Sequence, residues 1–247
     1  MYDATLGRFM KTDRYAEKYV SLSPYQYVAN NPVNNLDVNG DSIWFTSEYN
    51  DDRQLIGLTM HVTGKVLNDS NEKIDMATVT SNITKGIGRA YKGEVDGISF
   101  NTDVQLSSAK NMDEVSNSDH LFVLTDKISK IKDGEIYGAS NYPGGKVSFI
   151  NADYFSGIYD EILGSRNYGS FTAAHEFGHL AGLEHSRNLF NLMRSNGMFY
   201  GINASQLRTI YNKWGRGNLN MGTNYILNPI GQKRPNTGFA GIYIKSW

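Results

Sequence analysis

Four stretches of the chain have the apolar spacing of β-strands. Leu55 to Leu67 is rich in Thr, Val, Ile and Leu, and Gly97 to Leu106 alternates apolar with polar residues. His120 to Leu124 is almost continuously apolar, which is typical of a strand buried on both faces. Lys146 to Ile150 has the same character. The pattern therefore predicts a sheet in the middle of the chain.

Two shorter features lie just before Lys146. Ile136 to Ala139 predicts a short edge strand, because the run is brief and is followed at once by turn residues. Asn141 to Gly145 is Asn-Tyr-Pro-Gly-Gly, a sequence that favours a tight turn. Together they predict an edge strand that reverses into the next strand.

A first helix is predicted over Ile74 to Ala90, where apolar residues recur at helical spacing. The polar residues Asp69 to Glu72 just before it offer capping side chains. Gly86 and Gly88 weaken the end of this helix, since glycine is a poor helix former.

Two further helices are predicted nearer the C-terminus. One begins at Ser170 or Thr172, either of which can cap it, and runs to about Ala181. The other covers Ala204 to Trp214 and carries its apolar residues on one face.

The order of these elements is β, α, β, β, β, β, α, α, which favours an α+β fold with a mixed, twisted sheet and helices packed on it. Residues 1–42 differ from the rest, because Tyr, Asn, Pro and Gly dominate and no apolar period is sustained. We therefore expect a short irregular segment, 1–42, and a domain, 43–247. Residues 215–247 are rich in Gly and Asn, and only a final strand at Ala240 to Lys245 is predicted there.

Composition narrows the functions that fit. The 247 residues carry a net charge of −1, which does not favour nucleic acid or an anionic membrane as a partner. No apolar run reaches the roughly 18 residues of a membrane span, and the N-terminus lacks the pattern of a signal peptide. The protein either stays inside the cell or travels as part of something longer. Cysteine is absent, so any zinc must be held by His, Asp or Glu.

One motif contains residues that can bind a metal ion. Residues 175 to 185 are His-Glu-Phe-Gly-His-Leu-Ala-Gly-Leu-Glu-His, and three of the five histidines fall within it. On a helix, His175 and His179 share a face and can bind one metal ion. Gly182 can adopt a positive φ, end the helix and return the chain, so that His185 arrives as a third ligand.

Three protein ligands leave a zinc ion with an open position for water, as in catalytic sites. Zinc lowers the pKa of that water and polarises a carbonyl group. Glu176 lies beside His175 and can act as the general base that takes the water proton and passes it to a leaving amine. The motif predicts a zinc-dependent endopeptidase acting on protein or peptide, with one catalytic zinc ion.

The five fixed residues match the signature of the metzincin metalloproteases, H-E-x-x-H-x-x-G-x-x-H followed by a Met-turn. This resemblance implies a metzincin-like fold with an active-site helix and a C-terminal helix. It also implies a methionine beneath the metal, for which Met193 is the first choice and Met198 the alternative. The segment Ile136 to Asn141 would pair with substrate, and the loop Arg194 to Gly201 would wall the pocket beyond the scissile bond.

The N-terminal segment resembles the RHS repeat-associated core. The matching elements are Tyr-Asp-x-x-x-Gly-Arg-Phe at 2–9, Ser-Pro-Tyr-Gln-Tyr at 23–27 and Asn-Asn-Pro at 30–32. Where that family usually has Asp-Pro, this chain has Asp13-Arg14 and Asp37-Val38, which weakens the case for self-cleavage. The resemblance implies a toxin or effector domain, secreted or delivered within a larger protein, with an immunity protein as partner.

Other readings stay open. The chain could be a non-catalytic or latent zinc-binding module of an RHS shell, for example with residues 1–42 across the cleft, or a zinc hydrolase acting on a non-peptide amide. His61 and His120 lie in strand-like runs and are interpreted as structural. A calcium ion is conceivable near Asp51, Asp52, Asp126 or Asp133, although no stretch forms a proper oxygen-ligand loop.

Overall fold

The computed structural model of the chain describes residues 2–3, 8–9, 42–126, 128, 137–155, 168–195 and 201–238. The chain divides into two compact units, Met1–Asp41 and Ser42–Trp247. In the first unit, β1 (Tyr2–Asp3) pairs antiparallel with β2 (Arg8–Phe9). The other residues that resemble the RHS core lie outside the described residues.

The second unit is built on a seven-stranded mixed sheet. Its strands are β3 (Ile43–Tyr49), β4 (Leu55–Asn68), β5 (Gly93–Val95), β6 (Ile98–Ala109), β7 (His120–Thr125), β8 (Gly138–Ser140) and β9 (Val147–Asn151). The order is β5-β6-β4-β7-β9-β8, and β3 also pairs with β4. The pairs β4–β6, β4–β7 and β7–β9 are parallel, whereas β3, β5 and β8 join antiparallel. The mixed sheet of the predicted α+β fold is therefore present.

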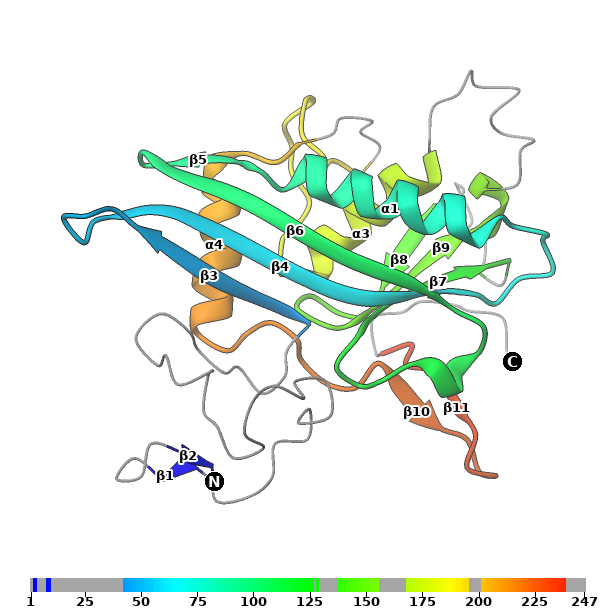
Figure 1. The fold of residues 1–247 in the computed structure, drawn as a ribbon. Helices are drawn as coiled ribbons and strands as arrows, with labels where there is room; N and C mark the ends of the chain where they lie inside the picture. The colour runs from blue at the N-terminus through cyan, green and yellow to red at the C-terminus, as the bar shows by residue number, and fades with distance from the viewer. Residues whose placement is uncertain are drawn as a thin grey trace. The chain divides into compact units, whose positions relative to one another are not determined.

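The helices α1 (Met76–Ala90) and α3 (Tyr168–Leu180) pack against each other on one face of this sheet (Figure 1). Alternate residues of β4 point into the core beneath them, among them Leu58, Met60 and Val62. The helix α4 (Ala204–Gly215) crosses near β3, where Phe45 contacts Tyr211 and Trp214. No helix in the described ranges is long and apolar enough to cross a membrane.

The apolar pattern located most of these elements. Strands β4, β6, β7 and β9 lie where they were predicted, and all six residues of β7 are buried. The short edge strand is also confirmed as β8, at one end of the sheet order, followed by the predicted turn. Strand β3 was missed, although Ile43 and Phe45 point into the core.

The predicted helix starts were wrong in two places. Asp75 caps α1, because its side chain accepts hydrogen bonds from the backbone N–H groups of Ala77 and Thr78. The earlier polar residues form a turn of their own, in which Asn68 accepts from Ser70. The helix α3 already includes Tyr168, so the two residues predicted as its cap, Ser170 and Thr172, lie inside it.

The predicted end of α1 at Ala90 is confirmed, and the helix continues through both Gly86 and Gly88. A Cβ atom on Gly86 would come 3.1 Å from the backbone oxygen of Ser170, so this glycine lets α1 and α3 approach closely. Glycine lowers the intrinsic stability of a helix, but Gly86 also provides a contact surface for α3.

The tail beyond α4 contains a structure that the sequence did not predict. β10 (Tyr225–Leu227) and β11 (Lys233–Pro235) form a separate two-stranded hairpin, and the predicted strand Ala240–Lys245 lies outside the described residues. Earlier in the tail, Asn220 has φ +58° and is buried. Its side chain accepts from Ser42 Oγ and Ile43 N and donates to Ile43 O, so the tail holds the first residues of β3.

Candidate metal centre

The helix α3 supplies the first three residues of the motif. His175 and Glu176 are 9% and 6% exposed, while His179 is partly buried. The helix ends at Leu180, and Gly182 follows with φ +80°. The backbone N–H of Leu183 donates to Gly178 O, and that of Gly182 to His179 O, which is a Schellman ending. This reversal carries the chain back towards the helix and His185.

The structure brings the three predicted metal ligands together. One nitrogen atom from each of His175, His179 and His185 lies within 4.8 Å of the others, and the Nε2 atoms of His179 and His185 are 3.2 Å apart. Two nitrogens bound to one tetrahedral zinc at about 2.05 Å would lie about 3.3 Å apart. The spacing of these imidazoles therefore fits a shared zinc ion, and no other such cluster exists in the described part of the chain.

Hydrogen bonds to the backbone fix the ring nitrogen that is left for a metal. His175 Nδ1 lies 2.7 Å from Leu192 O, and His179 Nδ1 lies 2.8 Å from Leu183 O. A carbonyl oxygen can only accept, so each Nδ1 carries the hydrogen and each Nε2 presents a lone pair. The neutral form of both rings is also favoured by their burial. Burial, and then the neighbouring histidines, lower the pKa of His175 to about 4, and burial lowers the pKa of His179.

Glu176 sits beside this cluster in a confined space. Burial raises the pKa of its carboxyl group to about 8. The edge strand β8 packs directly on its stem, because a Cβ atom on Gly138 would come 2.8 Å from Glu176 Cγ. Within the described residues, no donor forms a hydrogen bond with this carboxylate. A cation next to it would lower the cost of burying its charge.

Met193, predicted beneath the metal, lies buried against the helix that carries the ligands. Its Sδ atom occupies the space beside Gly178, where a Cβ atom would approach it to 2.2 Å. The Met193 oxygen accepts a hydrogen bond from Ser186 N, just after His185. Met198 and most of the predicted pocket loop, residues 196–200, lie outside the described residues.

Three features of the site had not been predicted. Tyr91, at the end of α1, is fully buried beneath α3 and donates from its hydroxyl group to Ala174 O, while its ring contacts Phe177 edge-on. Gly138 and Gly178 give β8 and Met193 their close approach to α3. Backbone carbonyl groups and close glycine contacts have no sequence signature of their own, so only the tertiary structure reveals these contacts.

The other histidines lie apart from the cluster. His61 is on the polar face of β4, between Thr46 Oγ1 and Asp103 Oδ2, with its ring stacked on Trp44. His120 is buried with its ring edge-on against Phe177.

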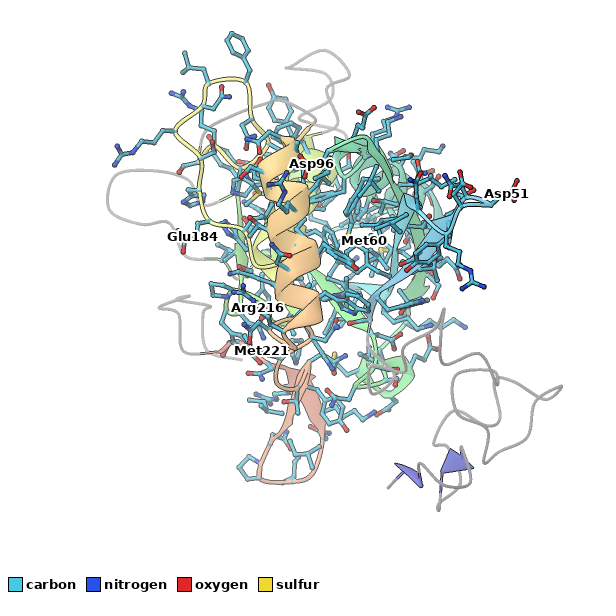
Figure 2. All side chains as sticks on the ribbon, turned by 90° about the vertical axis from the view of Figure 1, so that its left-hand side faces the viewer. Asp51, Met60, Asp96, Glu184, Arg216 and Met221 are labelled. Carbon is cyan, nitrogen blue, oxygen red and sulfur yellow. The ribbon has the colours of Figure 1, made fainter. Side chains whose placement is uncertain are left out.

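The residues considered for calcium are scattered. Asp51 and Asp52 lie in the exposed turn after β3, and Asp51 is well away from Glu184 (Figure 2). Asp126 accepts a hydrogen bond from Asn71, and Asp133 is outside the described residues. In the described ranges these carboxylates do not gather into a site.

The chain is similar to a known protein in its structure but matches no protein family. No protein-family model matches it, and no curated protein matches its sequence. Among solved structures it is similar to archaemetzincin from Methanopyrus kandleri, with 14% sequence identity and a TM-score of 0.43. That similarity covers 62% of this chain and 97% of the archaemetzincin chain. Function has to be inferred from the chemistry of the site itself.

Proposed function

We propose that the chain is a zinc-dependent endopeptidase of the metzincin type. The observation that carries the proposal is the convergence of three histidines, two of which have their Nδ1 atoms tied to backbone oxygens, beside a buried carboxylate. Three nitrogen ligands leave a coordination position open, and a structural site would have no use for Glu176. His175, His179 and His185 would hold the ion.

A zinc ion in this cluster would act as a Lewis acid on the scissile carbonyl group and make a water molecule more acidic. Glu176 would take up the proton of that water and deliver it to the departing amine. The nearby zinc ion would lower the raised pKa of this carboxyl group, so that it could be charged and accept the proton. Gly138 would leave the space that the carboxylate stem occupies, because a Cβ atom there would come 2.8 Å from Glu176 Cγ.

The substrate would bind as an extended strand along β8. This strand ends the sheet and pairs with β9 alone among the described residues. An edge strand offers unpaired backbone groups, and a peptide chain can add to them in extended form. The substrate class that fits is therefore an unfolded or extended segment of a protein.

The role of this peptidase in a larger assembly is proposed from sequence alone. The resemblance of residues 1–42 to the RHS core supports a delivered effector or toxin domain with an immunity protein as partner. A latent or non-catalytic module of an RHS shell is the alternative. Peptide cleavage by the full chain would favour the effector, whereas zinc binding without cleavage would favour the module.

The test is cleavage of a random peptide library followed by mass spectrometry, with zinc content measured in parallel. Glu176→Gln removes the base but keeps the size of the side chain, and we expect it to retain zinc and lower kcat/KM by about 10²–10⁴-fold. Glu184→Gln is the matched control, because Glu184 is an exposed carboxylate next to His185. Equal activity of Glu176→Gln and the wild type would refute the role of Glu176, and absence of zinc from the wild type would refute the proposal.

A further inference from the structure

A pair of side-chain amides links the turn that contains Met193 to the start of α4. Asn191 Nδ2 donates to Gln206 Oε1 over 2.7 Å, and Gln206 Nε2 donates to Asn191 Oδ1 over 3.1 Å. Asn191 is only 2% exposed. We propose that this pair positions the metal centre, so that Gln206 on α4 controls the orientation of His175. The inference rests on the proposed zinc site.

Asn191 is connected to the metal ligand His175 through the backbone around Leu192. Asn191 Oδ1 also accepts from Met193 N, so the asparagine side chain bridges over Leu192. Leu192 N donates to Gly201 O, which holds the same residue from its other side. The Leu192 carbonyl group is thereby fixed, and its oxygen is the acceptor for His175 Nδ1. A ring held at Nδ1 cannot turn freely, so its Nε2 keeps one direction.

Gln206 connects Asn191 to the helix α4. Gln206 Oε1 also accepts from Asn203 N, and Asn203 Oδ1 accepts from Gln206 N, which makes a capping box. Leu207 and Ile210 bury the same helix in the core. The buried face of α4 and the backbone N–H of Asn203 therefore hold the amide of Gln206, and that amide holds Asn191.

Backbone donors decide the orientation of both amides. Met193 N requires an oxygen at its end of Asn191, and Asn203 N requires an oxygen at its end of Gln206. Neither amide can flip without facing a donor with a donor. A carboxylate at either position keeps the backbone contact but places two oxygens against each other across the pair. Asn191→Asp and Gln206→Glu therefore each replace one of the two hydrogen bonds of the pair by a contact between two oxygens, while preserving side-chain size.

A control variant separates positioning from helix stability. Asn203→Ala removes the side-chain cap of α4, which costs about 1 kcal/mol of stability in general. It leaves Asn191 and Gln206 with all of their mutual contacts. If α4 contributes only stability, then Asn203→Ala and Gln206→Glu should affect metal binding alike.

The experiment measures the zinc dissociation constant of the full chain by competition with a chelator, together with urea unfolding of each variant. We expect Gln206→Glu and Asn191→Asp each to raise the zinc Kd by about tenfold, as is usual for groups that orient a ligand. We expect Asn203→Ala to change it by less than about threefold, although it lowers stability.

The possible outcomes separate this inference from the proposed function. A wild type that binds zinc, with an unchanged Kd in both carboxylate variants, would overturn the positioning role alone. An equal rise of Kd in Asn203→Ala and Gln206→Glu would also overturn it, since stability would then explain both. A wild type that binds no zinc would overturn the proposed function and this inference together.

Discussion

At the scale of single residues, the protonation of buried histidines governs what the domain can do. The two α3 imidazoles that donate to the backbone are kept neutral, which is the form a metal requires. His120 is likewise buried and lies apart from the metal cluster. Burial, and then the charge of Lys146, lower the pKa of His120 from 6.5 to about 3. This residue offers a way to measure the effect of burial and a nearby charge without a metal ion.

We predict that His120 makes the domain sensitive to acid. Its pKa is lower when folded, so the unfolded chain binds more protons between pH 6.5 and 3, and stability falls as pH drops through that window. At pH 4.5 the loss from this residue is about 2–3 kcal/mol relative to pH 7. His120→Leu should remove that part of the pH dependence, measured by urea unfolding at both pH values.

Phe122→Leu is the control for this experiment, because it changes a buried neighbour on β7 without touching a titratable group. Its stability should fall by a similar amount at pH 7 and at pH 4.5. If His120→Leu follows the wild-type pH dependence, then His120 is not the residue responsible.

At the scale of elements, α3 packs closely against both β8 and Met193. Gly138 brings β8 onto Glu176 and Gly178 admits Met193, so both contacts depend on a missing Cβ atom. The helix that carries the ligands is therefore held from two sides by close packing.

We predict opposite effects from two glycine substitutions in helices. A Cβ atom on Gly178 would collide with Met193 Sδ and with Tyr91 Oη, both of them buried. Gly178→Ala should therefore lower the free energy of unfolding by about 1–3 kcal/mol and weaken zinc binding. Gly88 in α1 has only Val104 at 4.0 Å, and Gly88→Ala should raise stability by about 0.5–1 kcal/mol. Urea unfolding measures both, and a stabilising Gly178→Ala would contradict the packing described for Met193.

Much of this arrangement could be predicted from the sequence, and the reasons for the misses are physical. The period of apolar residues located β4, β7 and α4, because packing against one core imposes that period. The motif spacing indicated three histidines that the fold brings together. The partners of those histidines are carbonyl groups of Leu183 and Leu192, which every residue possesses, so no pattern could reveal them.

At the scale of the whole molecule, the question is whether residues 42–247 form the complete folding unit. Ser42 is fully buried and its oxygen accepts from Thr63 N, so the contacts of this unit begin at its first residue. The segment 1–41 forms a compact unit of its own.

We predict that a chain starting at Ser42 folds and binds zinc like the full chain. Its unfolding free energy should lie within about 1 kcal/mol of the full-length value, because the contacts of β3 are internal to the second unit. Peptide cleavage measured on both forms also tests latency. A large rise in cleavage after removal of residues 1–41 would support inhibition by that segment, whereas equal rates would exclude it.

The contact between Asn220 and the first strand also bears on when the domain can fold during synthesis. The ribosome releases Ile43 first, and its partner Asn220 emerges 177 residues later, after all three histidines. A nascent chain would therefore contain all three histidines before the hydrogen bonds of Asn220 with Ser42 and Ile43 can form.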